Sequence, residues 1–159
     1  MKKGLVALIG GSIGAVIGAA AAGKFSKDVI EDKDKKVDKF KSYYNMLNQW
    51  LILAKEGKTL EEYFVENGYK TIAIYGMGEM GNRLYDELKN STVVEIKYAI
   101  DKNAASTYSE LNVIDVDDEM DEVDAVIVSA IFAFDEIEEE LSEKISCPII
   151  SLEDVVYEV

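Results

Sequence analysis

Glycine recurs at the spacing G-x-G-x-x-G in one stretch of the sequence, Gly76-Met77-Gly78-Glu79-Met80-Gly81. Between a strand and a helix, the first glycine of this pattern makes a tight turn and the second lets the backbone approach a pyrophosphate. The third lets the helix pack closely on the strand, and the helix N-terminus favours a phosphate group. The spacing therefore predicts a cofactor-binding loop made of these six residues.

An acidic residue, Asp101, follows 20 residues after Gly81, at the expected end of the next strand. A carboxylate at that place typically accepts a hydrogen bond from a ribose 2′-hydroxyl and disfavours a 2′-phosphate, which predicts NAD rather than NADP. The alternative interpretation is that Asp101 caps a loop, as aspartate often does. Because ligands lie over the C-terminal ends of parallel strands, we expect Ser129, at the end of a later apolar run, to join this site.

The side chains that most often carry catalysis are scarce in this sequence. The chain has no histidine, which removes the commonest general base and most zinc sites, and Cys147 is its single cysteine. We therefore predict neither a catalytic constellation nor a metal site. The net charge is −14, and residues 91–159 hold 19 acidic and 3 basic side chains. An acidic surface repels a phosphate backbone, so we expect no nucleic-acid partner.

Short apolar runs and amphipathic segments alternate along the C-terminal part of the chain. We expect strands at residues 71–75, 93–100, 111–114, 125–129 and 148–151, and helices at 81–89, at 135–144 and from residue 152. This alternation requires a parallel sheet with right-handed crossovers. The sequence therefore predicts an α/β fold, a Rossmann-like half-domain over residues 70–159 whose five-stranded parallel sheet has the order 3-2-1-4-5.

Four segments of this predicted domain carry a resemblance to a known family. They are Ile74-Tyr75-Gly76-Met77-Gly78-Glu79-Met80-Gly81, Tyr98-Ala99-Ile100-Asp101, Asp124-Ala125-Val126-Ile127-Val128 and Pro148-Ile149-Ile150-Ser151-Leu152. With them, the chain resembles the N-terminal nucleotide-binding domains of bacterial surface-polysaccharide enzymes. These include sugar O-acyltransferases of the sialic-acid and bacillosamine type and membrane-bound nucleotide-sugar dehydratases. The resemblance covers a little over half of the chain, and the glycine motif is its specific part.

The resemblance implies a ligand and a role. In that family the module binds a nucleotide, a nucleotide sugar or NAD, and catalysis resides in a following domain, whereas this sequence ends at Val159. We therefore expect a regulatory or accessory module that binds NAD or a nucleotide sugar and acts on a partner enzyme. Two alternatives stay open: a scaffolding protein that has lost its ligand, and a subunit of an NAD-dependent or sugar-nucleotide enzyme.

An uncharged run of 20 residues occupies positions 4–23, and as a helix it would span a bilayer core of roughly 30 Å. Small residues recur in it every four positions, at Gly10, Gly14, Gly18 and Ala22, which lets two membrane helices approach closely. The lysines that follow place the C-terminal domain in the cytoplasm by the positive-inside rule. The sequence thus predicts a single-pass cell-membrane anchor over residues 1–23. A signal peptide and an interfacial segment are the alternatives.

Residues 24–69 are expected to form a charged linker and a helical hairpin. The first helix should end at Gly57, and Thr59-Leu60-Glu61-Glu62 predicts a capping box that opens the second. Heptad spacing in the first helix is shown by Val37, Phe40, Tyr44, Leu47, Leu51 and Ala54, beside a second stripe of Tyr43, Met46, Trp50 and Leu53. Two interpretations remain, a helix packed on its own domain and the seam of a parallel homodimer. Together with the membrane stripe, the heptads favour the homodimer.

Overall fold

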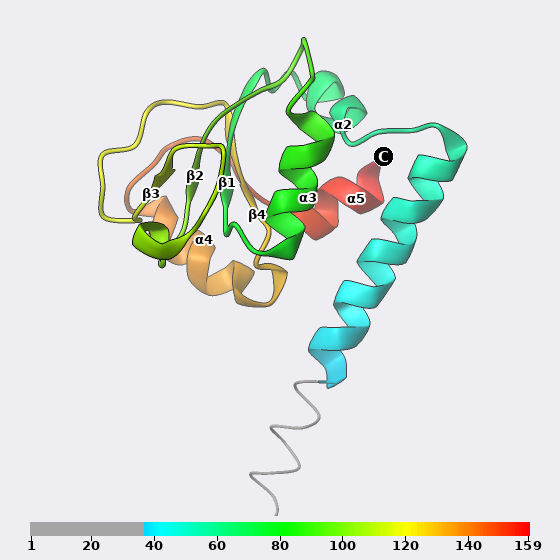
Figure 1. Ribbon diagram of the computed structural model, residues 1–159, viewed down its shortest axis with the longest axis horizontal. Coiled ribbons are helices and arrows are strands. Elements are labelled where there is room, and N and C mark those ends of the chain that lie inside the picture. Colours follow the sequence, from blue (N-terminus) through cyan, green and yellow to red (C-terminus); the bar gives the residue numbers. More distant parts are fainter. Residues whose placement is uncertain (1–36) are drawn as a thin grey trace, which may run out of the picture. The chain divides into compact units, whose positions relative to one another are not determined.

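The computed structural model of the chain describes residues 37–159 (Figure 1). The predicted membrane anchor, residues 1–23, and the first part of the charged linker lie outside the described residues. Within residues 37–159, no helix is both long enough and apolar enough to cross a membrane. The chain divides into two compact units, Met1–Tyr44 and Asn45–Val159, and the second unit contains the whole sheet.

The second unit is built on a five-stranded, entirely parallel sheet with the strand order β3-β2-β1-β4-β5. The strands are β1 Thr71–Tyr75, β2 Glu95–Ile100, β3 Val113–Ile114, β4 Ala125–Val128 and β5 Ile149–Ser151. This sheet confirms the predicted α/β class and the predicted order. The two central strands are almost fully buried, which explains why their sequences are continuous apolar runs rather than alternating ones.

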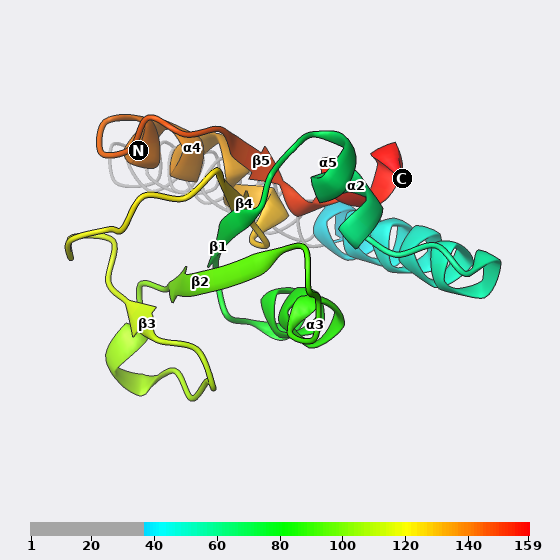
Figure 2. The ribbon, with the colours of Figure 1, turned by 90° about the horizontal axis from the view of Figure 1, so that it is seen from above.

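Helices cover both faces of this sheet. They are α2 Glu61–Glu66, α3 Glu79–Leu88, α4 Phe134–Ser142 and α5 Leu152–Glu158, with single 3₁₀ turns at Ala104–Ser106 and Ile131–Ala133. Figure 2 shows α3 on one face of the sheet and α4 on the opposite face. The apolar stripe of α4, Ile137 and Leu141, packs with Ala73 and Tyr75 of β1. The other face of β1 is completely buried through Ile72 and Ile74.

Most element boundaries lie within two residues of those predicted, and local side chains explain one of the differences. Strand β2 begins at Glu95 and not at residue 93, because the Ser91 hydroxyl accepts hydrogen bonds from the amides of Val93 and Val94. These bonds hold both residues in a turn instead of the sheet. Helix α3 begins at Glu79, two residues before its predicted start, so that Gly81 lies inside its first turn.

The helix that precedes the domain is continuous over residues 37–56 of the described chain and ends at Gly57, as predicted, with a positive φ of 77°. Its two apolar stripes have different environments. Met46, Trp50 and Leu53, from the second stripe, are buried at 0, 9 and 3% exposure. Leu51, from the heptad stripe, remains 54% exposed. The helix therefore packs on its own domain through the second stripe and leaves the heptad stripe open.

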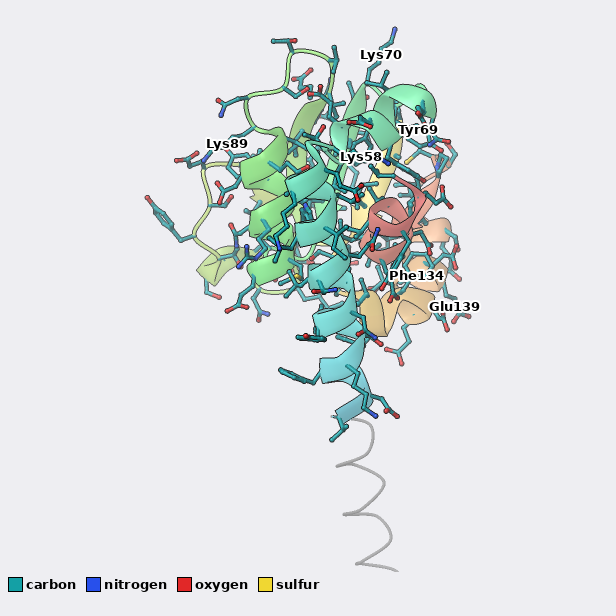
Figure 3. All side chains as sticks on the ribbon, turned by 90° about the vertical axis from the view of Figure 1, so that its right-hand side faces the viewer. Lys58, Tyr69, Lys70, Lys89, Phe134 and Glu139 are labelled. Atoms are coloured by element: carbon teal, nitrogen blue, oxygen red, sulfur yellow. The ribbon has the colours of Figure 1, made fainter. Side chains whose placement is uncertain are left out.

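Glu87 of α3 joins this helix to α2. Its carboxylate accepts a hydrogen bond from the Trp50 indole nitrogen at 2.5 Å and another from the Leu60 amide at 2.7 Å. Farther along, the Lys58 ammonium donates to the carbonyl of Val159 at 2.8 Å, beside α5 (Figure 3). Hydrogen bonds from Trp50, Lys58 and Leu60 thus attach this part of the chain to α3 and to the C-terminal residue.

The capping box predicted for α2 forms only in part. The N-cap residue is Leu60, whose side chain cannot accept a hydrogen bond. Glu62 does reach back to the amide of Thr59, over a long 3.4 Å. The prediction of Thr59 as the cap was wrong, and the Leu60 amide at the start of α2 donates to Glu87 from another helix.

Candidate functional site

The candidate site lies where the chain leaves β1 and β4 in opposite directions. Tyr75 pairs with Ile100 of β2 and with Val128 of β4, so the C-terminal ends of the three strands coincide. The chain turns from β1 into α3 on one face of the sheet and from β4 into α4 on the other (Figure 1). Open parallel sheets bind ligands at such a reversal, because the two loops part there and leave a crevice.

The first glycine of the loop is required by the fold. Gly76 has a φ of +89°, and its amide donates to the Ile100 carbonyl at 2.8 Å. A Cβ at this position would lie 3.0 Å from the hydroxyl oxygen of Ser129. Both the backbone conformation and the close neighbour therefore exclude a larger residue.

The third glycine is required even more strictly, whereas the second is not required at all. A Cβ at Gly81 would lie 2.0 Å from the carbonyl oxygen of Gly76, an impossible contact. A Cβ at Gly78 would meet no heavy atom within 4 Å, and the φ of −74° suits any residue. Gly78 is the N-cap of α3, and the space that a side chain would occupy at this position is open. No internal contact of the described chain accounts for a glycine at position 78.

Two polar side chains hold the loop in shape. The buried Ser129 hydroxyl, at the end of β4, donates to the Gly76 carbonyl at 2.6 Å. The side-chain amide of Asn82 donates to the backbone carbonyls of Met77 and Gly78 at 2.8 and 2.9 Å. Ser129 was expected at the site as a ligand contact, and the structure places it beside the loop as a brace. The sequence analysis did not predict a role for Asn82, although a side chain with two amide donors directly after the third glycine could have indicated one.

Asp101, which directly follows β2, also contacts the loop. One carboxylate oxygen accepts from the Met77 amide at 2.9 Å, and the other accepts from the Asn103 amide at 2.8 Å. The carboxylate therefore caps its own turn and links it to the glycine loop. Each oxygen can accept a second hydrogen bond, so this fixed orientation leaves acceptor capacity for a ligand hydroxyl.

The side chains between the glycines have separate roles. Met77 and Met80 are buried at 5 and 7% exposure, so only their backbone groups border the loop surface. Glu79 is exposed at the first position of α3. The amides in the first turn of a helix have no acceptor within the helix, and these are the donors the loop can offer to an anionic ligand.

A pocket of about 260 Å³ opens beside the loop, on the α4 side of the strand ends. It is lined by Tyr75, Gly76, Asp101, Lys102, Ala130, Ala133, Glu136 and Ile137. The lining combines small and apolar residues with three charged ones, Asp101, Lys102 and Glu136. Its volume is below the roughly 300–1,000 Å³ of drug-sized ligand sites, so it suits a single ring-sized group. Sequence reasoning predicted two of these residues, Gly76 and Asp101.

Tyr75 also lines this pocket, and its hydroxyl is buried inside the domain. Its residue is 4% exposed, and its hydroxyl is the one fully buried side-chain polar atom of residues 37–159 without a hydrogen-bond partner. Burial raises the pKa of this hydroxyl, and the Lys102 ammonium, the polar group nearest to a partner for it, lowers the pKa by less through its charge and a weak hydrogen-bonding contribution. Lys102 itself is paired with Glu140 of α4 at 3.1 Å, and this contact raises the pKa of the lysine. A buried polar atom without a partner is rare, because it forfeits a hydrogen bond made in water.

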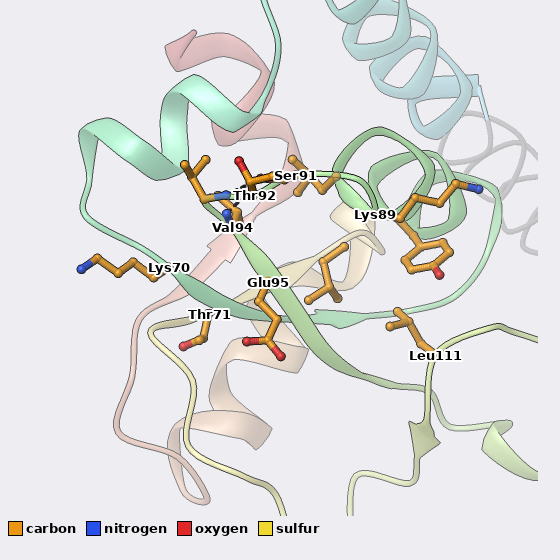
Figure 4. Close-up of a pocket in the computed structure, with 12 residues that line it drawn as sticks. Lys70, Thr71, Lys89, Ser91, Thr92, Val94, Glu95 and Leu111 are labelled. Carbon is orange, nitrogen blue, oxygen red and sulfur yellow. Dashed lines mark hydrogen bonds between the residues drawn. The ribbon is translucent and has the colours of Figure 1, made fainter.

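A larger pocket, of about 420 Å³, lies at the opposite end of the central strands, around the start of β2 (Figure 4). Its two lysines do not converge on it, since Lys70 and Lys89 point in opposite directions in Figure 4. The Ser91 hydroxyl there already serves the turn before β2. Within residues 37–159, no group of three or more potential metal ligands is assembled at this or any other place.

Comparisons with known proteins return no match: no protein family, no curated protein and no solved structure resembles the chain closely enough to count.

Proposed function

We propose that this chain is a nucleotide-binding module, and that the glycine loop at residues 76–81 is its phosphate site. The observation that carries the proposal is Gly78, a glycine that neither its φ nor its surroundings require. In the G-x-G-x-x-G pattern, that position lacks a side chain so that a pyrophosphate can approach the backbone. The other two glycines are explained by the fold, so Gly78 is the one that points to a ligand.

The remaining features support a nucleotide that extends from the loop in two directions. A ribose hydroxyl would donate to Asp101, and a 2′-phosphate would be repelled by that carboxylate, which favours NAD over NADP. A ring-sized end group would enter the pocket that Gly76, Asp101 and Lys102 line beside the loop. The nicotinamide ring of NAD and the sugar of a nucleotide sugar are both single rings with polar groups that could face the charged residues of this pocket.

The role that we propose is regulatory or accessory, with the ligand sensed on behalf of a partner enzyme. Residues 4–23 would anchor the module in the cell membrane as a single pass and hold residues 37–159 in the cytoplasm, because the lysines after the apolar run resist translocation. A link to cell-surface polysaccharide synthesis follows from the resemblance of the glycine loop and strands to nucleotide-binding domains of that pathway's enzymes.

The test is a ligand panel on the full chain in detergent micelles. Isothermal titration calorimetry with NAD, NADP, a UDP-sugar and coenzyme A should show binding of NAD or the UDP-sugar at micromolar concentration. Asp101→Ala should reduce the preference for NAD over NADP about tenfold, the size of one charge-assisted hydrogen bond. If all four ligands fail to bind below millimolar concentration, the module does not bind nucleotides.

One observation favours a second function, that of a scaffold whose domain has no ligand. Both carboxylate oxygens of Asp101 are already engaged by backbone amides, and one of these, Met77, belongs to the glycine loop. The Met77 amide and the Asp101 carboxylate are thus already bonded to each other and not to a ligand. The panel separates the two functions, because a scaffold would bind none of the four ligands while the domain remains folded.

A further inference from the structure

A second feature of the domain is an apolar groove between the preceding helix and α3. The groove has a volume of about 300 Å³ and is lined by Leu47, Trp50, Leu51, Ala54, Arg83, Asp86 and Glu87. Trp50 in this lining is buried, and its indole nitrogen donates a hydrogen bond to Glu87 at 2.5 Å. Its outer wall is Leu51, which is 54% exposed. This is a preformed apolar surface outside the nucleotide site.

The spacing of the wall residues indicates what kind of partner fits. Leu47, Leu51 and Ala54 are separated by steps of four and three, the a and d spacing of a coiled coil. The same steps continue toward the N-terminus at Val37, Phe40 and Tyr44, and these three side chains are 50, 73 and 62% exposed. A helix with this repeat packs against another helix with the same repeat, and an identical helix meets the requirement by two-fold symmetry.

The charges beside the groove support an identical and parallel partner. With Leu51 at position a, Trp50 is at position g and Lys55 at position e. In a parallel pair, a g residue lies beside the e residue of the partner's following heptad. Of the three charged residues that line the groove, Asp86 and Glu87 are acidic and Arg83 is basic, so Lys55 of a second copy would approach a surface with a net negative charge. An antiparallel pair would instead bring the e positions of the two helices together.

We propose that a second copy of this chain occupies the groove, in a parallel homodimer with Leu51 against Leu51 and Lys55 against Asp86 and Glu87. The contact is isologous, so each groove receives the helix of the other copy and each charge contact occurs twice. The second stripe of the same helix remains packed on its own domain through Met46, Trp50 and Leu53. One helix thus serves both interfaces, and dimerisation does not depend on a bound nucleotide.

Site-directed cross-linking of the full chain in detergent micelles tests this proposal. Cys147→Ser removes the single native cysteine, and Leu51→Cys or Ile52→Cys is then introduced. Ile52 is a matched control, because it is exposed at 40% and neighbours Leu51 but lies about 100° around the helix. Mild oxidation should cross-link Leu51→Cys at least about tenfold faster than Ile52→Cys. Equal cross-linking of the two variants, or none for Leu51→Cys, would overturn the proposed seam.

The charge contact is tested by reversal. Lys55→Glu should weaken the dimer about tenfold, because two symmetric rim contacts change from attraction to repulsion. Lys55→Glu combined with Asp86→Lys should restore most of that loss. The measurement is the dissociation constant from sedimentation equilibrium, expressed relative to the unmodified chain so that any contribution of residues 4–23 cancels. An unchanged constant for Lys55→Glu would reject the parallel register.

Discussion

The Ser129 hydroxyl and the Gly76 carbonyl form a hydrogen bond of 2.6 Å that joins the ends of β4 and β1 across the candidate site. Ser129 is 4% exposed, so water does not compete for this bond. The same hydroxyl oxygen would lie 3.2 Å from a Cβ at Gly81. One side chain thus sets the place of the glycine turn and lies close to the start of α3.

Ser129→Ala should lower the free energy of unfolding by about 1–3 kcal/mol, because the Gly76 carbonyl would lose its side-chain donor in a buried setting. Ser142→Ala is the matched control, since Ser142 is exposed and its hydroxyl bonds only to the Glu139 carbonyl in its own helix. Urea unfolding followed by circular dichroism measures both variants. Equal decreases in the free energy of unfolding for the two variants would show that the Ser129 hydrogen bond does not stabilise the domain more than an exposed one does.

Substitutions of the second and third glycines of the loop should differ in their effect on stability. Gly81→Ala should cost about 3 kcal/mol or more, because its Cβ would stand 2.0 Å from the Gly76 carbonyl oxygen and the helix would have to shift. Gly78→Ala should change the stability by about 1 kcal/mol or less, since its Cβ meets nothing within 4 Å. Thermal unfolding of the two variants checks this order, and the reverse order would contradict the described loop geometry.

Glu87→Ala should loosen the attachment of the preceding helix to the domain. The indole nitrogen of Trp50 and the amide of Leu60 would both lose a charged acceptor, at a combined cost of about 2–4 kcal/mol. Trp50 is the single tryptophan, so its fluorescence reports on this contact alone and should shift to the red. Glu138→Ala, which removes an exposed carboxylate from α4, should leave the emission unchanged.

The carboxylate of Asp124 should account for part of the loss of stability at acid pH. Its carboxylate accepts from the Thr71 and Lys70 amides at 2.8 Å each, and these bonds hold its pKa below the usual value. A depressed folded pKa contributes stability above the unfolded pKa of about 3.9 and loses it as the pH falls through the folded value. The stability deficit of Asp124→Asn should therefore be constant from pH 5 to 8 and shrink below pH 4. A deficit that persists to pH 2 would exclude this carboxylate as the source.

The fold was predictable because its main signals are local. The apolar run of β1, the glycines after it and the amphipathic pattern of α3 are adjacent in sequence, and each constrains the next. The end of β2 at Ile100 was likewise found from sequence. Its start at Glu95 was not, because that start depends on a single hydroxyl, Ser91, that competes with the sheet for backbone amides.

The details of the candidate site depend on contacts between distant segments, which periodicity does not reveal. Tyr75 looks like any other apolar strand residue, and only the packing of α4 shows that its hydroxyl is buried without a partner. Asp101 was expected near the loop, but its bonds to the Met77 and Asn103 amides depend on the exact path of two turns. Both apolar stripes of the preceding helix could be recognised in the sequence. Only the burial in the structure shows that Trp50 packs on the domain and that Leu51 is exposed.

The most direct test of the nucleotide site compares the full chain with its Gly78→Val variant in calorimetric titrations with NAD and with a UDP-sugar. We predict binding of at least one of the two at micromolar concentration by the unmodified chain. Gly78→Val should bind neither, because its side chain would fill the space that a pyrophosphate needs, while its unfolding transition stays within a few degrees of the unmodified chain. Equal affinities for the two chains, or no binding below millimolar concentration by either, would contradict the proposed phosphate site.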